Sequence, residues 1–315
     1  MNSSSLWPIG EHDVGHQPGP GDPVVIGPAD RRGANRRRPR GLPSRRGRRR
    51  RVLATVIVAI GGVTAASIAL VASRRPAPVV SLCSTLPASG GAAFELTPDQ
   101  ARNAAVIAAV AAKLGLPDHA VTVALATALQ ESRLLNLPYG DLDSVGLFQQ
   151  RPSQGWGAPS QLLDPVYAST AFYGRLTQVS GWQTMPVAAA AQAVQHSAAP
   201  SAYAAWDAEA RTLATALTGE TPAGFSCQLA AYTGAPPAPG TFAGTQVADL
   251  GAALVGRPVS VKTGWRVASW AVGMAWQFHL TRVSFAGWTW TPGGGRWRRA
   301  PSPAGSAGEV VVAAG

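Results

Sequence analysis

Two short segments decide the fold of this chain: ATALQES at residues 126–132 and GLFQ at residues 146–149. The first places Glu131 near the end of an otherwise apolar predicted helix, and the second begins fifteen residues after Glu131 in a segment rich in glycine. A carboxyl group in apolar surroundings favours its neutral form, which is the form that a general acid needs. The two segments therefore predict a helix that holds a proton donor beside an irregular loop.

This arrangement suits the cleavage of a glycosidic bond. Such cleavage needs a protonated carboxyl group delivered to the leaving oxygen, and Glu131 on a rigid helix would supply it. The following loop would line a groove in which Gln149 and Gln150 offer hydrogen bonds to sugar and Trp156 offers a stacking face. The sequence thus predicts a saccharide site around Glu131.

Two alternatives stay open at this point. Glu131 would be an ordinary helix-terminal glutamate if it paired with Arg133 or Arg151. Asp143 either positions a water molecule as a second carboxylate or serves turn formation, since aspartate favours turns. The choice for Asp143 separates hydrolysis from a mechanism that uses one carboxylate alone.

These residues resemble a known family. Glu131-Ser132 followed by Gly146–Gln149 is similar to the Glu-Ser and Gly-Leu-Met-Gln pair of the lytic transglycosylase and goose-type lysozyme superfamily. The longer run Asp143–Gly157 (DSVGLFQQRPSQGWG) resembles a lysozyme-like domain of actinobacterial exported proteins, and Ala191–Ser197 also fits that domain. The resemblance covers about residues 94–217.

The resemblance implies that Glu131 is the catalytic acid of an enzyme that cuts peptidoglycan glycan strands, as a lytic transglycosylase or a muramidase. The residues expected to contact the saccharide are Ser132, Gly146, Phe148, Gln149, Gln150, Trp156 and Gln195. Two positions depart from the family. Its Ala-Tyr-Asn segment, whose tyrosine faces the glutamate, reads Ala193-Val194-Gln195 here, and Phe148 replaces a methionine. The alternative function is a non-catalytic wall-binding or scaffold protein that keeps the fold.

Helix signals predict a compact all-α domain over residues 94–220. Thr97 and Gln100 form a predicted capping box with Pro98 at the first helical position. A second helix follows Pro117, a third begins at Asp164, and alanine-rich segments predict two more helices before residue 219. Five short helices and one long loop are the expected architecture.

The N-terminal part predicts a membrane anchor. Val52–Ser73 (VLATVIVAIGGVTAASIALVAS) contains 22 residues without a charge, and a helix needs roughly 20 to cross the hydrocarbon core. Twelve arginines lie between residues 31 and 51, in a tail (residues 1–51) whose composition predicts disorder. The positive-inside bias predicts a single-pass protein with a cytoplasmic N-terminus and most of the chain outside the membrane. A cleaved signal peptide is the alternative.

The net charge of +11 belongs to this tail, since residues 76–315 carry 13 Lys plus Arg against 12 Asp plus Glu. A nucleic-acid partner is therefore not expected. No His, Cys or carboxylate cluster has metal-ligand spacing, and no phosphate-binding motif is present, so neither a metal nor a cofactor is expected. The expected partners are peptidoglycan strands and the membrane.

Cys83 and Cys227 bracket the predicted all-α domain, and an even pair outside the cytoplasm predicts a disulfide. Residues 76–93 and 221–245 are predicted linkers. Six of the ten tryptophans fall between Trp265 and Trp297, within a predicted small α/β module at residues 246–315. The predicted fold class is thus mainly α: one transmembrane helix, a lysozyme-like all-α domain and a C-terminal α/β module.

Overall fold

The structure is a computed structural model that describes residues 80–85, 93–197, 199, 201–233, 254–300 and 308–314. The chain divides into two units, Met1–Arg75 and Pro76–Gly315, and every described residue lies in the second. The predicted tail and the predicted transmembrane segment Val52–Ser73 lie outside the described residues.

The helices of the first part follow the sequence signals. The main ones are α2 (Pro98–Lys113), α3 (Asp118–Ser132), α5 (Pro165–Leu176), α6 (Val187–Gln195) and α7 (Asp207–Leu217), with a short α4 (Pro159–Leu162). The predicted capping box of α2 is confirmed, because Thr97 N donates to the Gln100 side chain and Gln100 N donates to Thr97 Oγ1. Helix α3 is buried from Ala120 to Leu129, so it forms the centre of the helical core.

A three-stranded antiparallel sheet joins the two ends of this helical part. Its strands are β1 (Leu82–Thr85), β2 (Glu95–Leu96) and β3 (Phe225–Gln228), in the order β2-β1-β3. Cys83 lies directly opposite Cys227 in the β1–β3 pair, and the two form a disulfide bond. The predicted disulfide is confirmed.

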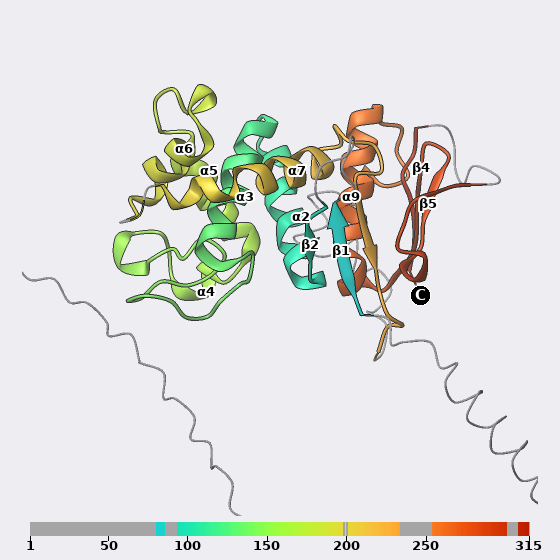
Figure 1. The fold of residues 1–315 in the computed structure, drawn as a ribbon, viewed down its shortest axis with the longest axis horizontal. Helices are drawn as coiled ribbons and strands as arrows, with labels where there is room; N and C mark the ends of the chain where they lie inside the picture. The colour runs from blue at the N-terminus through green and yellow to red at the C-terminus, as the bar shows by residue number, and fades with distance from the viewer. Residues whose placement is uncertain are drawn as a thin grey trace, which may run out of the picture. The chain divides into compact units, whose positions relative to one another are not determined.

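A second antiparallel sheet lies at the C-terminal end. It contains β4 (Leu280–Phe285), β5 (Trp288–Trp290), β6 (Arg298–Arg299) and β7 (Val311–Ala314), in the order β6-β5-β4-β7. Helix α9 (Val261–Phe278) lies between this sheet and α2, as Figure 1 shows. Trp290 Nε1 and Trp297 Nε1 donate to the carbonyl oxygens of Cys227 and Phe225, so tryptophans of the C-terminal part are bonded to β3.

The predicted fold class is wrong. The described residues are not an all-α domain with an α/β appendix, because two antiparallel sheets accompany the helices and the first of them uses strands from segments that were expected to be linkers. None of the helices in the described residues has the length and apolar character to cross a membrane. The first sheet was missed because β1 is only four residues long and its pairing partner β3 follows 140 residues later, so no local pattern reveals the pair.

Candidate active site

Glu131 occupies the last turn of α3, where its side chain is half-buried. Its Oε1 accepts a hydrogen bond from the Tyr203 hydroxyl at 2.6 Å and a longer one from Gln195 Nε2 at 3.3 Å. Its Oε2 accepts none from the residues that the structure describes. One oxygen of the carboxyl group is therefore held by two donors, and the other is left for a different partner.

Tyr203 is the residue that sequence reasoning missed. It belongs to a short 3-10 helix, η3 (Ala202–Trp206), and is fully buried. Burial, the hydrogen bond to Glu131 and the charge of Glu131 all raise the pKa of the Tyr203 hydroxyl, in that order of size. Tyr203 therefore stays protonated at neutral pH and acts as the donor in this bond. The expected tyrosine is absent from Ala193-Val194-Gln195, but a tyrosine reaches the glutamate from another element.

Gln195, the last residue of α6, connects the carboxyl group to the following loop. Its Nε2 donates to the Phe148 carbonyl oxygen at 2.7 Å as well as to Glu131. The sequence predicted that Gln195 contacts the saccharide. The structure places its side chain between Glu131 and the backbone of the loop, in a position that orients the carboxyl group.

Ser132 attaches the same loop to the end of α3. Its buried hydroxyl donates to the Leu147 carbonyl oxygen at 2.7 Å and to Ala128 in the preceding turn at 3.1 Å. The Glu-Ser pair and the Gly-Leu-Phe-Gln segment are therefore in direct contact. Ser132 fixes the loop through the backbone and has little surface left for a substrate.

Three other predicted saccharide residues serve the packing of the loop. Gly146 has a φ of +79°, and a Cβ there would lie 2.4 Å from the Leu162 carbonyl oxygen, so only glycine fits. Phe148 is fully buried and stacks on Phe172 with ring centroids 4.7 Å apart. The buried Gln150 donates through Nε2 to the Ala168 carbonyl oxygen. These side chains give the loop its shape.

Trp156 and Gln149 differ in exposure. Trp156 is 6% exposed, and the Arg175 guanidinium lies 3.5 Å from its ring centroid, so one ring face is already covered. Gln149 is partly exposed, and its Nε2 donates to the Tyr139 and Gly146 carbonyl oxygens. Of the two, Gln149 retains more surface for contact with a ligand.

Asp143 is engaged with its own loop. Its Oδ1 accepts from Arg151 Nε at 2.9 Å and from the Ser153 hydroxyl at 3.0 Å, and its Oδ2 accepts from Ser153 N at 2.7 Å. The hydrogen bonds from Arg151 and then from Ser153 lower the pKa of Asp143 to about 2. Asp143 is therefore an ionised, hydrogen-bonded carboxylate of low basicity.

Glu131 is not paired with Arg133 or Arg151, which was the alternative that the sequence left open. Arg133 lies over the Trp206 ring, 3.9 Å from its centroid, and Arg151 pairs with Asp143. Among the described residues Glu131 forms no salt bridge. Trp206 also donates through Nε1 to the Gln130 side chain at 2.8 Å. Trp206 therefore contacts both Gln130 and Arg133, one residue before and two residues after Glu131.

Two cavities in the described part of the chain lie away from Glu131. One is enclosed by α2, α9 and the first residues of α3, and another lies between α2, α5 and α9; Glu131 lines neither. In the described parts of the chain no three His, Cys, Asp or Glu residues come together as a metal site would require. The half-buried Glu131 therefore has its donors on Oε1 and, among the described residues, no donor on Oε2.

Comparisons with known proteins give no family assignment. No protein-family model matches the chain, and no curated protein matches it. The resemblance to the lytic transglycosylase and goose-type lysozyme superfamily stays a prediction based on the motifs.

Proposed function

We propose that this protein cleaves the glycan strands of peptidoglycan, with Glu131 as general acid and then general base. The observation that carries the proposal is the set of contacts at the Glu131 carboxyl group. Tyr203 and Gln195 hold Oε1, whereas Oε2 has no hydrogen-bond donor among the described residues. A second support is the resemblance of Glu131-Ser132 and Gly146–Gln149 to the motif pair of the lytic transglycosylase and goose-type lysozyme superfamily. The Ser132 hydroxyl joins these two segments through the Leu147 carbonyl oxygen.

The contacts suggest a role for each group. Glu131 delivers its proton from Oε2 to the glycosidic oxygen as the bond to the leaving sugar breaks. The carboxylate that forms is stabilised by the donors on Oε1, since hydrogen bonds to an ionised acceptor are stronger than neutral ones. Tyr203 and Gln195 are thus positioning residues, and Glu131 is the group that contacts the substrate.

We further propose the one-carboxylate route of a lytic transglycosylase. An effective general base has a pKa near the working pH, and the hydrogen bonds from Arg151 and Ser153 lower the pKa of Asp143 to about 2. A hydroxyl group of the same sugar would then attack the carbon whose glycosidic bond has broken. Its proton would pass to the Glu131 carboxylate, and the product would carry an anhydro end. A muramidase would instead need a group that positions water.

The disulfide bond supports an extracytoplasmic location. Structural disulfides form in oxidising compartments such as the space outside the cytoplasmic membrane, and Cys83–Cys227 joins the two ends of the helical part. This is the compartment in which peptidoglycan is found.

The test is the release of soluble muropeptides from purified sacculi by the unit Pro76–Gly315. We expect the wild type to release fragments with anhydro-muramic ends and Glu131→Gln to release none, because glutamine keeps the shape but cannot transfer a proton. The matched control is Glu95→Gln, an exposed glutamate of β2. It should behave like the wild type.

Each other outcome contradicts a defined part of the proposal. Fragments with reducing ends would replace the transglycosylase by a hydrolase. Equal activity of Glu131→Gln and wild type would remove Glu131 from the mechanism. Binding of sacculi without any release would indicate the non-catalytic scaffold.

A further inference from the structure

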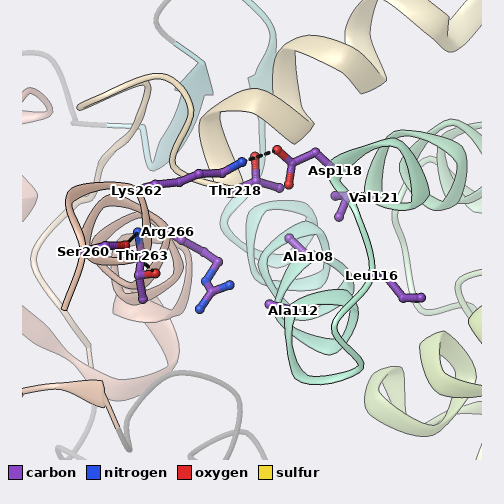
Figure 2. A pocket seen from close by; sticks show the side chains of 10 residues that line it. All are labelled: Ala108, Ala112, Leu116, Asp118, Val121, Thr218, Ser260, Lys262, Thr263 and Arg266. Atoms are coloured by element: carbon purple, nitrogen blue, oxygen red, sulfur yellow. Dashed lines mark hydrogen bonds and ion pairs between the residues drawn. The ribbon is translucent and has the colours of Figure 1, made fainter.

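A polar cavity lies away from Glu131, where the first turns of α9 face α2 and the start of α3. It has a volume of about 130 Å³, and Figure 2 shows its lining. Ala108 and Ala112 of α2 form an apolar wall. Opposite them, Lys262 and Arg266 extend from α9 into the space beside α2. The cavity therefore combines a small apolar surface with two cations and the Asp118 carboxylate.

Arg266 is one of the two cations that line this cavity. The side chain is half-buried, and no described residue forms a salt bridge or hydrogen bond with its guanidinium group. Burial lowers the pKa of Arg266, while the charge of Asp118 acts in the opposite direction. Arginine remains charged in proteins even so, and its planar group presents several N–H donors that match the two oxygens of an oxyanion.

Lys262 is already compensated. Its Nζ lies 2.7 Å from Asp118 Oδ2 and 3.3 Å from Glu220 Oε1, and these contacts raise the pKa of Lys262. The Lys262–Asp118 pair spans one side of the cavity in Figure 2. Arg266 is therefore the cation of this cavity whose charge is not balanced by a direct partner among the described residues.

Thr218 gives an independent indication of a ligand. It lines the cavity, is 4% exposed, and its Oγ1 has no hydrogen-bond partner in the described structure. Buried hydroxyl groups are normally hydrogen-bonded because leaving one unsatisfied is unfavourable. The next residue, Gly219, lies close to α9, since a Cβ there would lie 2.1 Å from the Lys262 carbonyl oxygen.

We infer that this cavity binds a small oxyanion of the phosphate or carboxylate class, held by the Arg266 guanidinium and the Thr218 hydroxyl. The ligand would place its charged oxygens against Arg266 and any short apolar part against Ala108 and Ala112. This site is separate from the one around Glu131 and does not depend on the proposed activity.

The experiment measures thermal unfolding of the full-length protein in phosphate, in acetate and in sodium chloride at matched ionic strength and pH. A ligand that binds only the folded state raises the melting temperature. We expect phosphate, acetate or both to raise it above the chloride value. Protection by phosphate alone assigns a phosphate group, and protection by acetate alone assigns a carboxylate. Equal melting temperatures in the three salts would overturn the inference.

Variants locate the site. Arg266→Gln should weaken anion binding by about tenfold or more, as expected for loss of a charge-assisted contact, whereas Arg282→Gln, at an exposed position of β4, should not. Thr218→Val should weaken the anion effect and leave the anion-free protein at least as stable, because it removes an unpartnered buried hydroxyl. If Arg266→Gln fails to fold, the anion-dependent rise in melting temperature of Arg266→Lys and of Thr218→Val tests the site. Unchanged anion protection in both would place the anion elsewhere.

Discussion

Gly273 of α9 faces Ala105 of α2 so closely that a Cβ added at Gly273 would lie 2.7 Å from the Ala105 Cβ. This contact joins α9 directly to α2. We predict that Gly273→Ala lowers the free energy of unfolding by about 1–3 kcal/mol through overpacking. Gly174→Ala is the matched control: Gly174 lies within α5 with open space around its Cβ position, so alanine should stabilise by about 0.5–1 kcal/mol. Urea unfolding measures both, and stabilisation by both would contradict the packing.

Tyr203→Phe tests the positioning of Glu131. The variant removes only the hydroxyl that donates to Glu131 Oε1. Hydrogen bonds to charged groups contribute about 1.5–3 kcal/mol, so we expect the rate of muropeptide release to fall by roughly 10–100-fold. Binding to sacculi should change little. Tyr232→Phe, which loses a hydroxyl bond to the Leu280 carbonyl oxygen, is the control and should keep its activity. Comparable rate losses in the two variants would indicate a general loss of stability instead.

Asp143 predicts a specific dependence of stability on pH. Its pKa of about 2 in the folded protein lies below the ordinary value of 3.8. The contribution to folding is therefore present above pH 3.8 and is lost as the pH falls through about 2. We predict that Asp143→Asn is less stable than the wild type at pH 7 and that this difference shrinks between about pH 4 and pH 2. Asp141→Asn, at an exposed position of the same loop, is the comparison. A difference that is constant over this range would exclude the Arg151 and Ser153 contacts as its cause.

The disulfide bond predicts a large effect of reduction. Cys83 and Cys227 are 144 residues apart in sequence, and bridges that close long loops stabilise by about 2–5 kcal/mol. The double variant Cys83→Ser, Cys227→Ser should lose this amount in urea unfolding. Adding a reductant should destabilise the wild type and leave the double variant unchanged. Mass analysis under non-reducing conditions that finds two free thiols would contradict the bond.

Local signals predicted the helices well. Thr97 and Gln100 make the capping bonds that their spacing indicated, and Asp164 caps α5 by accepting from Val166 N. The Ser132 hydroxyl joins the end of α3 to the loop at residues 146–149 through the Leu147 carbonyl oxygen, whereas the sequence suggested a saccharide contact for Ser132. These features depend on residues close in sequence or on a recognised motif.

Long-range features could not be predicted in the same way. Tyr203 lies 72 residues after Glu131 in a short 3-10 helix, and nothing in AYAAW indicates that its tyrosine points at a carboxyl group. The aromatic ring of Phe148 and the amide of Gln150 suggested contacts with a ligand. In the structure both side chains are buried against α5, where Phe148 stacks on Phe172 and Gln150 donates to the Ala168 carbonyl oxygen. The pairing of β1 with β3 depends on chain closure and has no local pattern.

The position of the disulfide bond has a mechanical consequence. Cys83 and Cys227 are opposite each other in β1 and β3, and α2 to α7 all lie between them in sequence. A tensile force applied to the chain before Cys83 and after Cys227 is carried by the covalent bond, and the intervening helices bear no load. Glu131, Tyr203 and Gln195 would therefore keep their relative positions under such a force. Reducing the bond would transfer the same force to the helices that hold these three side chains together.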